Sequence, residues 1–505
     1  MSDKYVLAVD AGSTGARCLI TDLKGNLVSL GQEKWAYVTP RDVSPLAREF
    51  NPQLFWRIIC RAIRKAIGKA HINPADIIGV SATSQREGTV FLDKEGRELY
   101  AGPNIDLRAL SEGMLIDNEF GEEIYSLTGH KPSFLFVPAK LKWFEANRPE
   151  IYHRIAKVLT VSDWIIYKLS GEPVGEVCGA NELGLVDLRE RKWSNKLQGL
   201  LKLPEGIYPR LGEAGDLVGM VSHRAALESG LPQGIAVSLS TPDTQCGLIG
   251  LGIKEEGEAG IIAGWSAPIQ MVTDKPILDS QARLWTGCYV LRKWVLESNA
   301  GEAGSIYYWI KEVMFGRSKL ERVYGLMDRL AQQAPAGAEG TLAFLGPEAM
   351  NMTRLGLKYG GFLFPLPLNT ADIRREHLIR GMLENLCFAI KANCIQLEES
   401  SGLKIKKISL GGSLAKSECL AQILPAVLNF PVSLPDFTEV SALGAAICAA
   451  TGAGIYSCLE EAINAMKAKD KIIEPEPLTA SEYAEYYQKW EATGKWLEKL
   501  SEEIL

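Results

Sequence analysis

The segment Tyr5-Val6-Leu7-Ala8-Val9-Asp10-Ala11-Gly12-Ser13-Thr14-Gly15-Ala16-Arg17 starts as an apolar run and ends in a polar turn that contains glycine. The run predicts a buried strand over 5–9 that ends in an acid. A second strand is predicted at 17–22. Asp22-Leu23-Lys24-Gly25-Asn26 then has the composition of a hairpin turn, which leads into a third strand at about 26–35. The chain is therefore expected to open as two successive hairpins.

A helix and another strand follow the hairpins. Residues 52–71 carry apolar side chains at helical spacing, namely Leu54, Ile58, Ile59, Ala62, Ile63, Ala66 and Ile67. Residues 77–82 read as a short buried strand, and 90–96 read as a strand with a turn. Hairpins that are followed by a helix and a further strand indicate a mixed α/β sheet.

The second half of the chain repeats this order of elements. A strand, a turn and a return strand are expected over 258–273, and a later strand is expected at 405–410. Two helices follow, at 417–428 and 439–450. The length of 505 residues predicts two or more domains, and we place the boundary near residue 250, which gives domains 1–250 and 251–505. A charged amphipathic helix is expected at 481–505, packed on the surface and without a chemical role.

Composition narrows the class of protein. The net charge of −6 argues against nucleic acid as the main partner. The ten cysteines are scattered without a Cys-x-x-Cys pair, which is typical of reduced thiols in a cytoplasmic protein. No signal peptide is visible, and the weakly polar stretch 441–454 is too short to cross a bilayer. We expect no membrane partner, and a homodimer is one expected state.

Asp10 to Arg17 has the residue types that hold a metal ion and a phosphate. Backbone amides around Gly12, with the hydroxyls of Ser13 and Thr14, can donate to phosphate oxygens, and Arg17 can add a charged donor. Asp10 can hold Mg²⁺, through water in part, because this ion keeps much of its hydration shell. The alternative is an ordinary hairpin turn without a ligand.

A polar cluster follows the strand at 77–82. Gln85 and Arg86 supply donors, while Glu87 and, further along, Asp106 supply acceptors for hydroxyl groups. Such a set suits a polyhydroxylated substrate, and the alternative is a pair of solvated, salt-bridged loops.

Asp243 stands between a short apolar strand and a predicted helix. A carboxylate in this position can accept the proton of an attacking hydroxyl, or it can cap the helix. Gly411, Gly412 and Ser413 end the strand at 405–410 and can admit a nucleotide against the backbone at a helix start, although a simple strand-to-helix turn is equally consistent. Two acids at distant strand ends favour a split site for phosphoryl transfer.

In this order the segments resemble the FGGY family of carbohydrate kinases, which belong to the actin-like ATPase superfamily. The resemblance runs from Tyr5 to about Gly454. It implies an α/β fold of two actin-like (ribonuclease H-like) domains, with the catalytic cleft between them, ATP and Mg²⁺ as cofactors, and a small sugar or polyol as substrate.

The resemblance also assigns roles to individual residues. Asp243 matches the catalytic base and, with Asp10, a position near the metal ion. Gln245 is expected at the substrate. Glu258 to Pro268 resembles the second phosphate motif, so Gly264 and Ser266 are expected at phosphate. Gly411 to Gln422 and Glu439 to Ala446 resemble the adenosine-binding part, which adds Lys416 to the predicted ATP-binding residues.

Three positions depart from the family pattern. Thr241-Pro242 stand where Gly-Gly usually precedes the catalytic acid, Trp265 replaces the threonine of the second phosphate motif, and Asn104 replaces a tryptophan of glycerol kinases.

Within the family, the segments around Arg86, Asp106 and Asp243 are most similar to those of autoinducer-2 kinases, which act on a short-chain dihydroxyketone. Xylulokinase, or another pentulose or polyol kinase, is the alternative within the family. Outside this class, Trp265 and Pro242 leave open a non-catalytic sugar or nucleotide sensor, and an actin-like polymerising ATPase is a third option.

Overall fold

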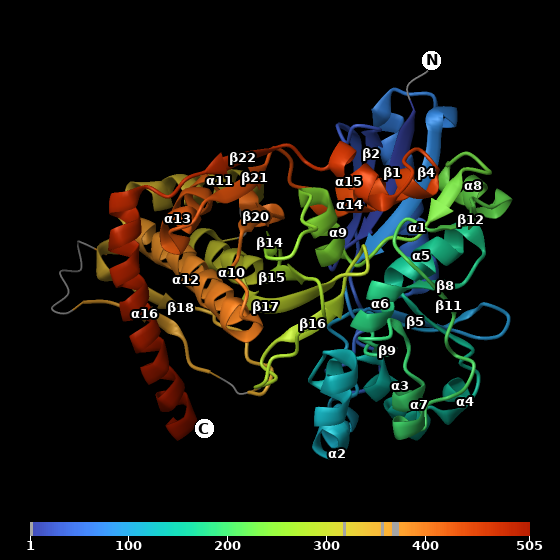
Figure 1. Cartoon of the computed structure of the whole chain (residues 1–505), viewed down its shortest axis with the longest axis horizontal. Helices are drawn as coiled ribbons and strands as arrows, with labels where there is room; N and C mark the ends of the chain where they lie inside the picture. The colour runs from blue at the N-terminus through green and yellow to red at the C-terminus, as the bar shows by residue number, and fades with distance from the viewer. Residues whose placement is uncertain (1–3, 317–319, 355–357, 366–372, 505) are drawn as a thin grey trace.

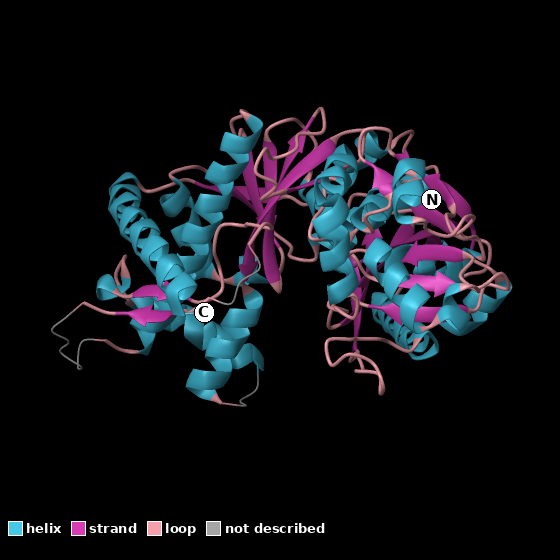
Figure 2. Cartoon of the chain, turned by 90° about the horizontal axis from the view of Figure 1, so that it is seen from below, coloured by secondary structure: helices cyan, strands magenta, loops and turns pink. Residues whose placement is uncertain are grey.

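The computed structural model describes residues 4–316, 320–354, 358–365 and 373–504, and these form two lobes joined side by side (Figures 1 and 2). The first lobe is built on a six-stranded sheet with the order β12-β13-β4-β1-β2-β3. Its strands are Leu217–Met220 (β12), Ala236–Ser238 (β13), Ile77–Ser84 (β4), Tyr5–Ala11 (β1), Gly15–Asp22 (β2) and Leu27–Lys34 (β3).

The opening hairpins and the first helix match the prediction. β1 pairs antiparallel with β2, and β2 pairs antiparallel with β3. The turn between β2 and β3 is closed by Asp22, whose side chain accepts from the backbone N–H groups of Lys24 and Asn26. Helix α1 (Pro52–Ala70) then crosses over, and its N-terminus is capped by the Asn51 side chain. The crossover allows β4 to pair parallel to β1.

The second lobe contains a seven-stranded sheet with the order β16-β17-β15-β14-β20-β21-β22. Its strands are Trp285–Cys288 (β16), Trp294–Glu302 (β17), Ser266–Thr273 (β15), Glu258–Ile262 (β14), Lys407–Gly411 (β20), Val432–Pro435 (β21) and Asp470–Ile473 (β22).

The two sheets share one topology. In the first, β3-β2-β1 are antiparallel neighbours and β1-β4-β13 are parallel. In the second, β17-β15-β14 are antiparallel neighbours and β14-β20-β21 are parallel. The prediction of a two-domain α/β fold, with the second half repeating the first, is confirmed.

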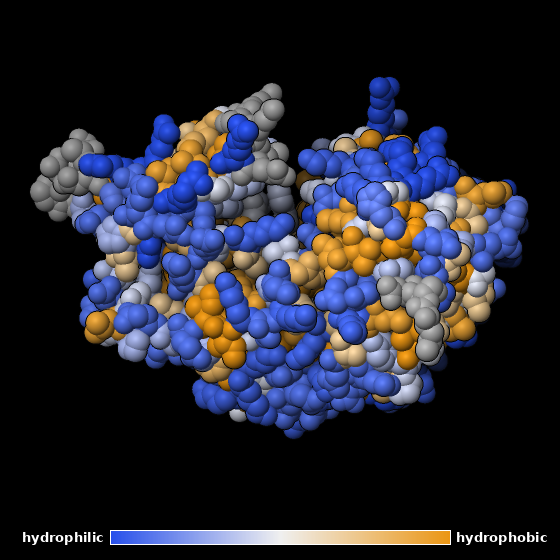
Figure 3. All heavy atoms as spheres, turned by 90° about the horizontal axis from the view of Figure 1, so that it is seen from above, coloured by the Kyte–Doolittle hydropathy of each residue, from blue (hydrophilic) through white to orange (hydrophobic). Residues whose placement is uncertain are grey.

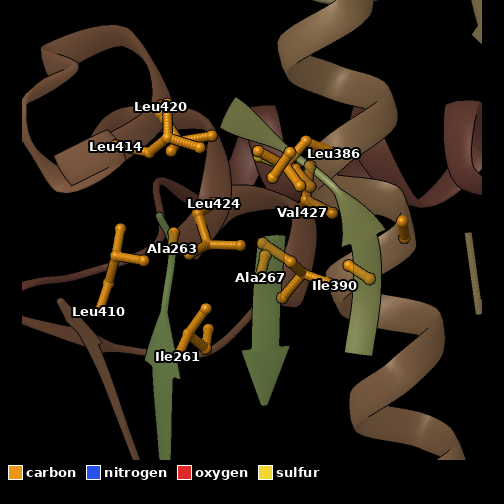
Figure 4. Packing of buried hydrophobic residues seen from close by; sticks show 14 of the residues in the cluster. Ile261, Ala263, Ala267, Leu386, Ile390, Leu410, Leu414, Leu420, Leu424 and Val427 are labelled. Atoms are coloured by element: carbon orange, nitrogen blue, oxygen red, sulfur yellow. The ribbon is translucent and has the colours of Figure 1, made fainter. Parts of the chain in front are cut away.

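The core of the second lobe lies between its sheet and two helices, α12 (Arg375–Ser401) and α13 (Glu418–Leu428). Ile261 from β14, Ile390 from α12 and Leu424 from α13 point into the space between these elements (Figure 4). Burial of these side chains fixes the sheet against the helices and so positions the ends of β14 and β20.

Two helices form a large part of the contact between the lobes. Helix α9 (Asp243–Leu251) follows β13, and α14 (Val440–Gly452) packs directly on it. The approach requires glycine, because a Cβ on Gly444 would lie 1.9 Å from the carbonyl oxygen of Cys246. Helices α14 and α15 (Leu459–Met466) also cover the first sheet (Figure 1). The division at residue 250 therefore stays a prediction, since two later helices pack on the first lobe.

The tail helix α16 (Pro477–Ile504) is more deeply packed than we expected, and its predicted end, Leu505, lies outside the described residues. Tyr483 is fully buried, and its hydroxyl donates to Glu384 of α12 (2.8 Å). Only part of the helix is at the surface, where Trp496 is 72% exposed. Among the described residues, no helix has the length and apolar character needed to span a membrane.

Candidate active site

Asp243 is the first residue of α9 and directly follows the turn after β13. Its Oδ1 accepts from the backbone N–H of Thr244 (2.9 Å). Burial raises the pKa of Asp243 to about 7, the charge of Arg86 acts to lower it, and the charge of Asp10 raises it further. A carboxyl group with this pKa is suited to exchange a proton near neutral pH.

Asp10 lies at the end of β1, and Arg17 Nη1 is 3.5 Å from its Oδ2. Burial raises the pKa of Asp10 to about 6, against the opposing charge of Arg17. Strands β1 and β13 are both parallel to β4, so Asp10, near the end of β1, and Asp243, after the end of β13, lie at the same edge of the sheet. The structure thus brings together the two acids that the sequence separates.

The predicted first phosphate turn connects β1 to β2. Gly12 N–H donates to the carbonyl of Gly15 (3.1 Å), which closes the turn. Thr14 is exposed, and Ser13 is half-buried beside it. Their hydroxyl groups therefore lie at an accessible turn next to Asp10.

The second predicted phosphate turn lies where β14 meets β15. Gly264 N–H donates to the carbonyl of Ser266 (2.9 Å). The neighbouring strand β20 ends at Gly411, and Gly412 follows it. Gly412 has φ +90, and a Cβ there would lie 2.5 Å from the carbonyl oxygen of Ala263. The two glycine turns are therefore packed against each other.

Ser413 and Lys416 follow Gly412 and are both exposed. The ring of Trp265, which is 57% exposed, lies beside Tyr308 of α10 (Gly304–Phe315), with 6.4 Å between the ring centroids. The residue that departs from the family motif therefore forms an aromatic contact at the surface next to the turn.

Glu439 links the two lobes at the phosphate side of the site. Its Oε2 lies 3.4 Å from Arg17 Nε, and its Oε1 lies 4.0 Å from Lys416 Nζ. The sequence placed Glu439 at the start of a segment that resembles the adenosine-binding part. It gave no sign of these ion pairs, because Glu439 stands 422 positions after Arg17.

Arg86 lies at the centre of the predicted substrate site, with its side chain 9% exposed. Its guanidinium donates twice to Glu297 of β17, Nη1 to Oε2 at 2.5 Å and Nη2 to Oε1 at 2.9 Å. Nη1 also lies 3.6 Å from Oε2 of Glu182, in α6 (Val177–Glu182). Glu87 is adjacent, with Oε1 3.8 Å from Arg86 Nε. Burial raises the pKa of Glu87 to about 8, the charge of Arg86 acts to lower it, and the neighbouring carboxylates raise it further.

Two of the carboxylates beside Arg86, those of Glu182 and Glu297, are also bound by glutamines. Gln245 Nε2 donates to Glu182 Oε1 (2.6 Å), and Gln270 Nε2 donates to Glu297 Oε2 (2.6 Å). The carbonyl oxygens of both glutamines are buried and have no partner, and Glu87 Oε1 is in the same state. Sequence reasoning found Gln245, but it missed Glu182, Gln270 and Glu297, which no local motif marks.

Gln85 and Asp106 are held inside the first lobe. Gln85 donates to Tyr37 Oη (2.7 Å) and accepts from the N–H of Asn104 (3.3 Å). Asp106 is fully buried and accepts from Arg108 Nε (2.7 Å), from the N–H of Arg48 (2.8 Å) and from Tyr100 Oη. Both oxygens of Asp106 are thus engaged by protein donors, which favours a role in holding the loop.

A buried lysine supports Glu87. Lys140 is fully buried, and its Nζ contacts the carbonyl oxygens of Leu135 (3.2 Å) and Glu87 (3.4 Å). Glu87 itself has φ +55, a conformation that is uncommon for a residue with a side chain. Lys140, in α3 (Val137–Asn147), thereby helps to fix the backbone that carries Glu87.

The chain matches known proteins over almost all of its length. Residues 5–250 match the model for the FGGY family of carbohydrate kinases, N-terminal domain, and residues 259–453 match the C-terminal domain. It is 31% identical to an autoinducer-2 kinase of Enterobacter sp. (strain 638), over 97% of this chain and 93% of that protein. A similar enzyme of Salmonella typhimurium is also 31% identical, over 97% and 94% of the two chains.

Solved structures share the fold. A ligand-bound xylulose kinase from Lactobacillus acidophilus superposes with a TM-score of 0.86 at 19% identity, covering 99% of this chain and 100% of that one. A glycerol kinase from Plasmodium falciparum with ADP has a TM-score of 0.81 at 18% identity, covering 96% and 97% of the chains. The family models and the curated relatives both span the two lobes, and the first lobe carries both Asp10 and Asp243. The chain belongs to the FGGY family of carbohydrate kinases, and it is a phosphotransferase.

Proposed function

We propose that this chain transfers the γ-phosphate of Mg²⁺-ATP to a hydroxyl of an autoinducer-2-type hydroxyketone, with Asp243 as the general base. The observation that carries this proposal is the placement of Asp10 and Asp243 at one sheet edge, close enough that the charge of one raises the pKa of the other. The named relatives over 97% of the chain favour the autoinducer-2 class. Location in the cytoplasm and a homodimeric state belong to the same proposal.

The residues at the sheet edge fit a magnesium ion. Mg²⁺ is commonly held by one or two carboxylates together with substrate phosphates and water, and Asp10 and Asp243 supply two carboxylates. Because the pKa of Asp10 is about 6, this group is mostly ionised at neutral pH. The bound ion would neutralise charge on the β- and γ-phosphate oxygens.

The other steps, proton transfer and the positioning of substrate and nucleotide, are assigned to side chains and backbone groups of the protein. Asp243 accepts the proton of the attacking hydroxyl, while Arg86, Glu87 and Gln245 orient the substrate. Gln85 and Asp106 act through the loops that they hold. On the nucleotide side, amide and hydroxyl donors face the phosphates, and we assign this role to Gly12, Ser13, Thr14, Arg17, Gly264, Ser266, Gly411, Gly412, Ser413 and Lys416. Positioning and charge stabilisation supply most of the acceleration in this kind of reaction.

The lobes meet at a surface notch, seen from above in Figure 3. Closure of the lobes around substrate would exclude water and limit the hydrolysis of ATP. Arg86 and Glu297 lie on different lobes, so a movement of this kind would act directly on the substrate side of the site.

ADP release tests the proposal across a panel of acceptors. The panel contains the autoinducer-2 precursor, D-xylulose, D-ribulose, glycerol and erythritol, with thermal shift as a second readout. We expect the highest kcat/KM with the autoinducer-2 precursor. Highest turnover of D-xylulose would instead support the xylulokinase alternative. Sugar binding without ADP release would support a sensor and overturn the kinase assignment.

A further inference from the structure

Two glutamate–glutamine pairs flank Arg86, one from each lobe. Glu182 and Gln245 belong to the first lobe, while Glu297 and Gln270 lie on β17 and β15 of the second. Arg86 lies between the two glutamates, at 2.5 Å from Glu297 and 3.6 Å from Glu182. The substrate side of the site therefore has a wall from the second lobe that no family motif in the sequence marks.

The orientation of the two glutamine side chains follows from their partners. A carboxylate only accepts, so Nε2 of each glutamine must face its glutamate, and Oε1 must face away. Both Oε1 atoms are buried without a partner, as is Oε1 of Glu87. Buried acceptors without donors are costly, so three of them around one guanidinium indicate a ligand that brings several donors.

The charge of the cluster limits what this ligand can be. Glu87, Glu182, Glu297 and Asp243 all influence one another or Arg86, and Arg86 is the cation that they share. Two further basic side chains are nearby. Lys140 Nζ contacts backbone carbonyls, and His130 contacts the Thr128 carbonyl through Nδ1 (2.8 Å) while its Nε2 lies 3.6 Å from Glu182 Oε2. A carboxylate on the ligand would add a fifth carboxyl group to a buried site that has three basic side chains. Hydroxyl groups supply donors without adding charge.

We propose that Gln270 and Glu297 are specificity-determining residues that make this site select neutral polyhydroxylated substrates and reject sugar acids. This inference rests on the proposed function, because it assumes that the hydroxyl attacked beside Asp243 belongs to the molecule bound at Arg86. The substrate would offer at least one hydroxyl in addition to the one that is phosphorylated. Gln270 Oε1 would accept from one of them, and Glu297 would hold both Gln270 and Arg86 in place.

The test compares matched neutral and acidic acceptors, erythritol with erythronate and xylitol with xylonate, in wild type and three variants. Gln270→Met removes the unpaired acceptor but leaves the Arg86–Glu297 pair, so KM for the neutral acceptor should rise roughly tenfold with little change in kcat. Glu297→Gln removes one negative charge, so the ratio of kcat/KM for acid over neutral acceptor should rise at least tenfold. Glu384→Gln is the control, since Glu384 forms a buried pair with Arg380 (2.9 Å) outside the site and should leave the ratio unchanged.

Calorimetric binding of the same acceptors separates this inference from the proposed function. If neither these acceptors nor the autoinducer-2 precursor is turned over, but the neutral acceptors bind and the acids do not, then the kinase proposal fails and the selectivity stands. If wild type phosphorylates or binds the acidic acceptor with the same kcat/KM or Kd as the neutral one, the proposed selectivity is wrong while the kinase proposal stands. An unchanged KM and Kd in Gln270→Met would also overturn the role of Gln270.

Discussion

Arg86 of the first lobe and Glu297 of the second are joined by two hydrogen bonds of 2.5 and 2.9 Å in a site that is almost closed to solvent. Glu297 is 2% exposed, so this is a buried ion pair that links the lobes. A buried pair adds little stability over well-packed apolar residues, but loss of one partner leaves an uncompensated charge. The pair therefore ties the relative position of the lobes to the group that is expected to hold the substrate.

Removal of the guanidinium should expose this dependence. Arg86→Met leaves Glu182 and Glu297 buried without their cation, and we expect the free energy of unfolding to fall by about 3–5 kcal/mol. Addition of Glu297→Gln should recover part of this loss, giving a coupling energy of roughly 0.5–3 kcal/mol in a double-mutant cycle. Urea unfolding of wild type, the two single variants and the double variant measures this coupling energy. Strictly additive changes in the free energy of unfolding would show that the two residues do not depend on each other.

Substitution of Glu439 should change KM for ATP and leave KM for the acceptor unchanged. Glu439→Gln loosens Arg17 and Lys416, which face the phosphate side from different lobes, so KM for ATP should rise by about three- to tenfold as charge-assisted contacts weaken. Steady-state kinetics with each substrate varied in turn gives the two KM values. Glu460→Gln, which removes a surface partner of Lys254, is the control. A lower KM for ATP, or a higher KM for the acceptor alone, would argue against this role.

Gly412 should tolerate no side chain. It has φ +90 and no room for a Cβ beside the Ala263 carbonyl, so Gly412→Ala should cost about 1–3 kcal/mol and raise KM for ATP. Gly402→Ala is a matched control, because Gly402 has φ +70 but no atom within 4 Å of the added Cβ. Thermal unfolding and ATP kinetics of the two variants make the comparison. Equal effects would mean that the conformation alone, and not the contact between the two glycine turns, decides the cost.

The hairpin topology could be predicted from the sequence because local signals specify it. Five apolar residues before Asp10, the Asp22–Asn26 turn and the apolar spacing in 52–71 each act over a few neighbours, and β1, β2 and α1 follow them closely. The tail helix was also predicted from local apolar spacing. Its deep packing could not be predicted, because Tyr483 bonds to a residue of α12 that lies about a hundred positions earlier.

The candidate site could also be predicted only in part. The strand-end acids and the glycine turns are local motifs, so their positions could be predicted from the sequence. The contacts of Arg86 with Glu182 and Glu297 join residues 96 and 211 positions apart, taken as the difference in residue number, and no periodicity marks them. For Asp106 the sequence suggested a contact that the structure does not favour. A buried-site carboxylate was expected to accept from the ligand, but donors of Tyr100, Arg48 and Arg108 already occupy its oxygens.

The pH dependence of turnover should follow the carboxyl group of Asp243. Its pKa is raised to about 7, and a general base works only when it has lost its proton. As the pH falls through 7, kcat/KM should therefore decline, approaching a tenfold loss for each further pH unit, and it should level off above about pH 8. A profile from pH 5.5 to 9 at saturating ATP measures this. A flat profile between pH 6 and 8 would mean that another group limits the reaction.

Asp243→Asn tests the central claim most directly, because it keeps the shape of the side chain and removes its ability to accept a proton. We predict that kcat falls by roughly 10²–10⁴ while Kd for the acceptor, measured by calorimetry, changes by less than about threefold. The residual rate should also lose the pH dependence that wild type shows near pH 7. Near-normal kcat in this variant, with binding intact, would contradict Asp243 as the base and with it the reading of the two lobes as the halves of one phosphoryl-transfer site.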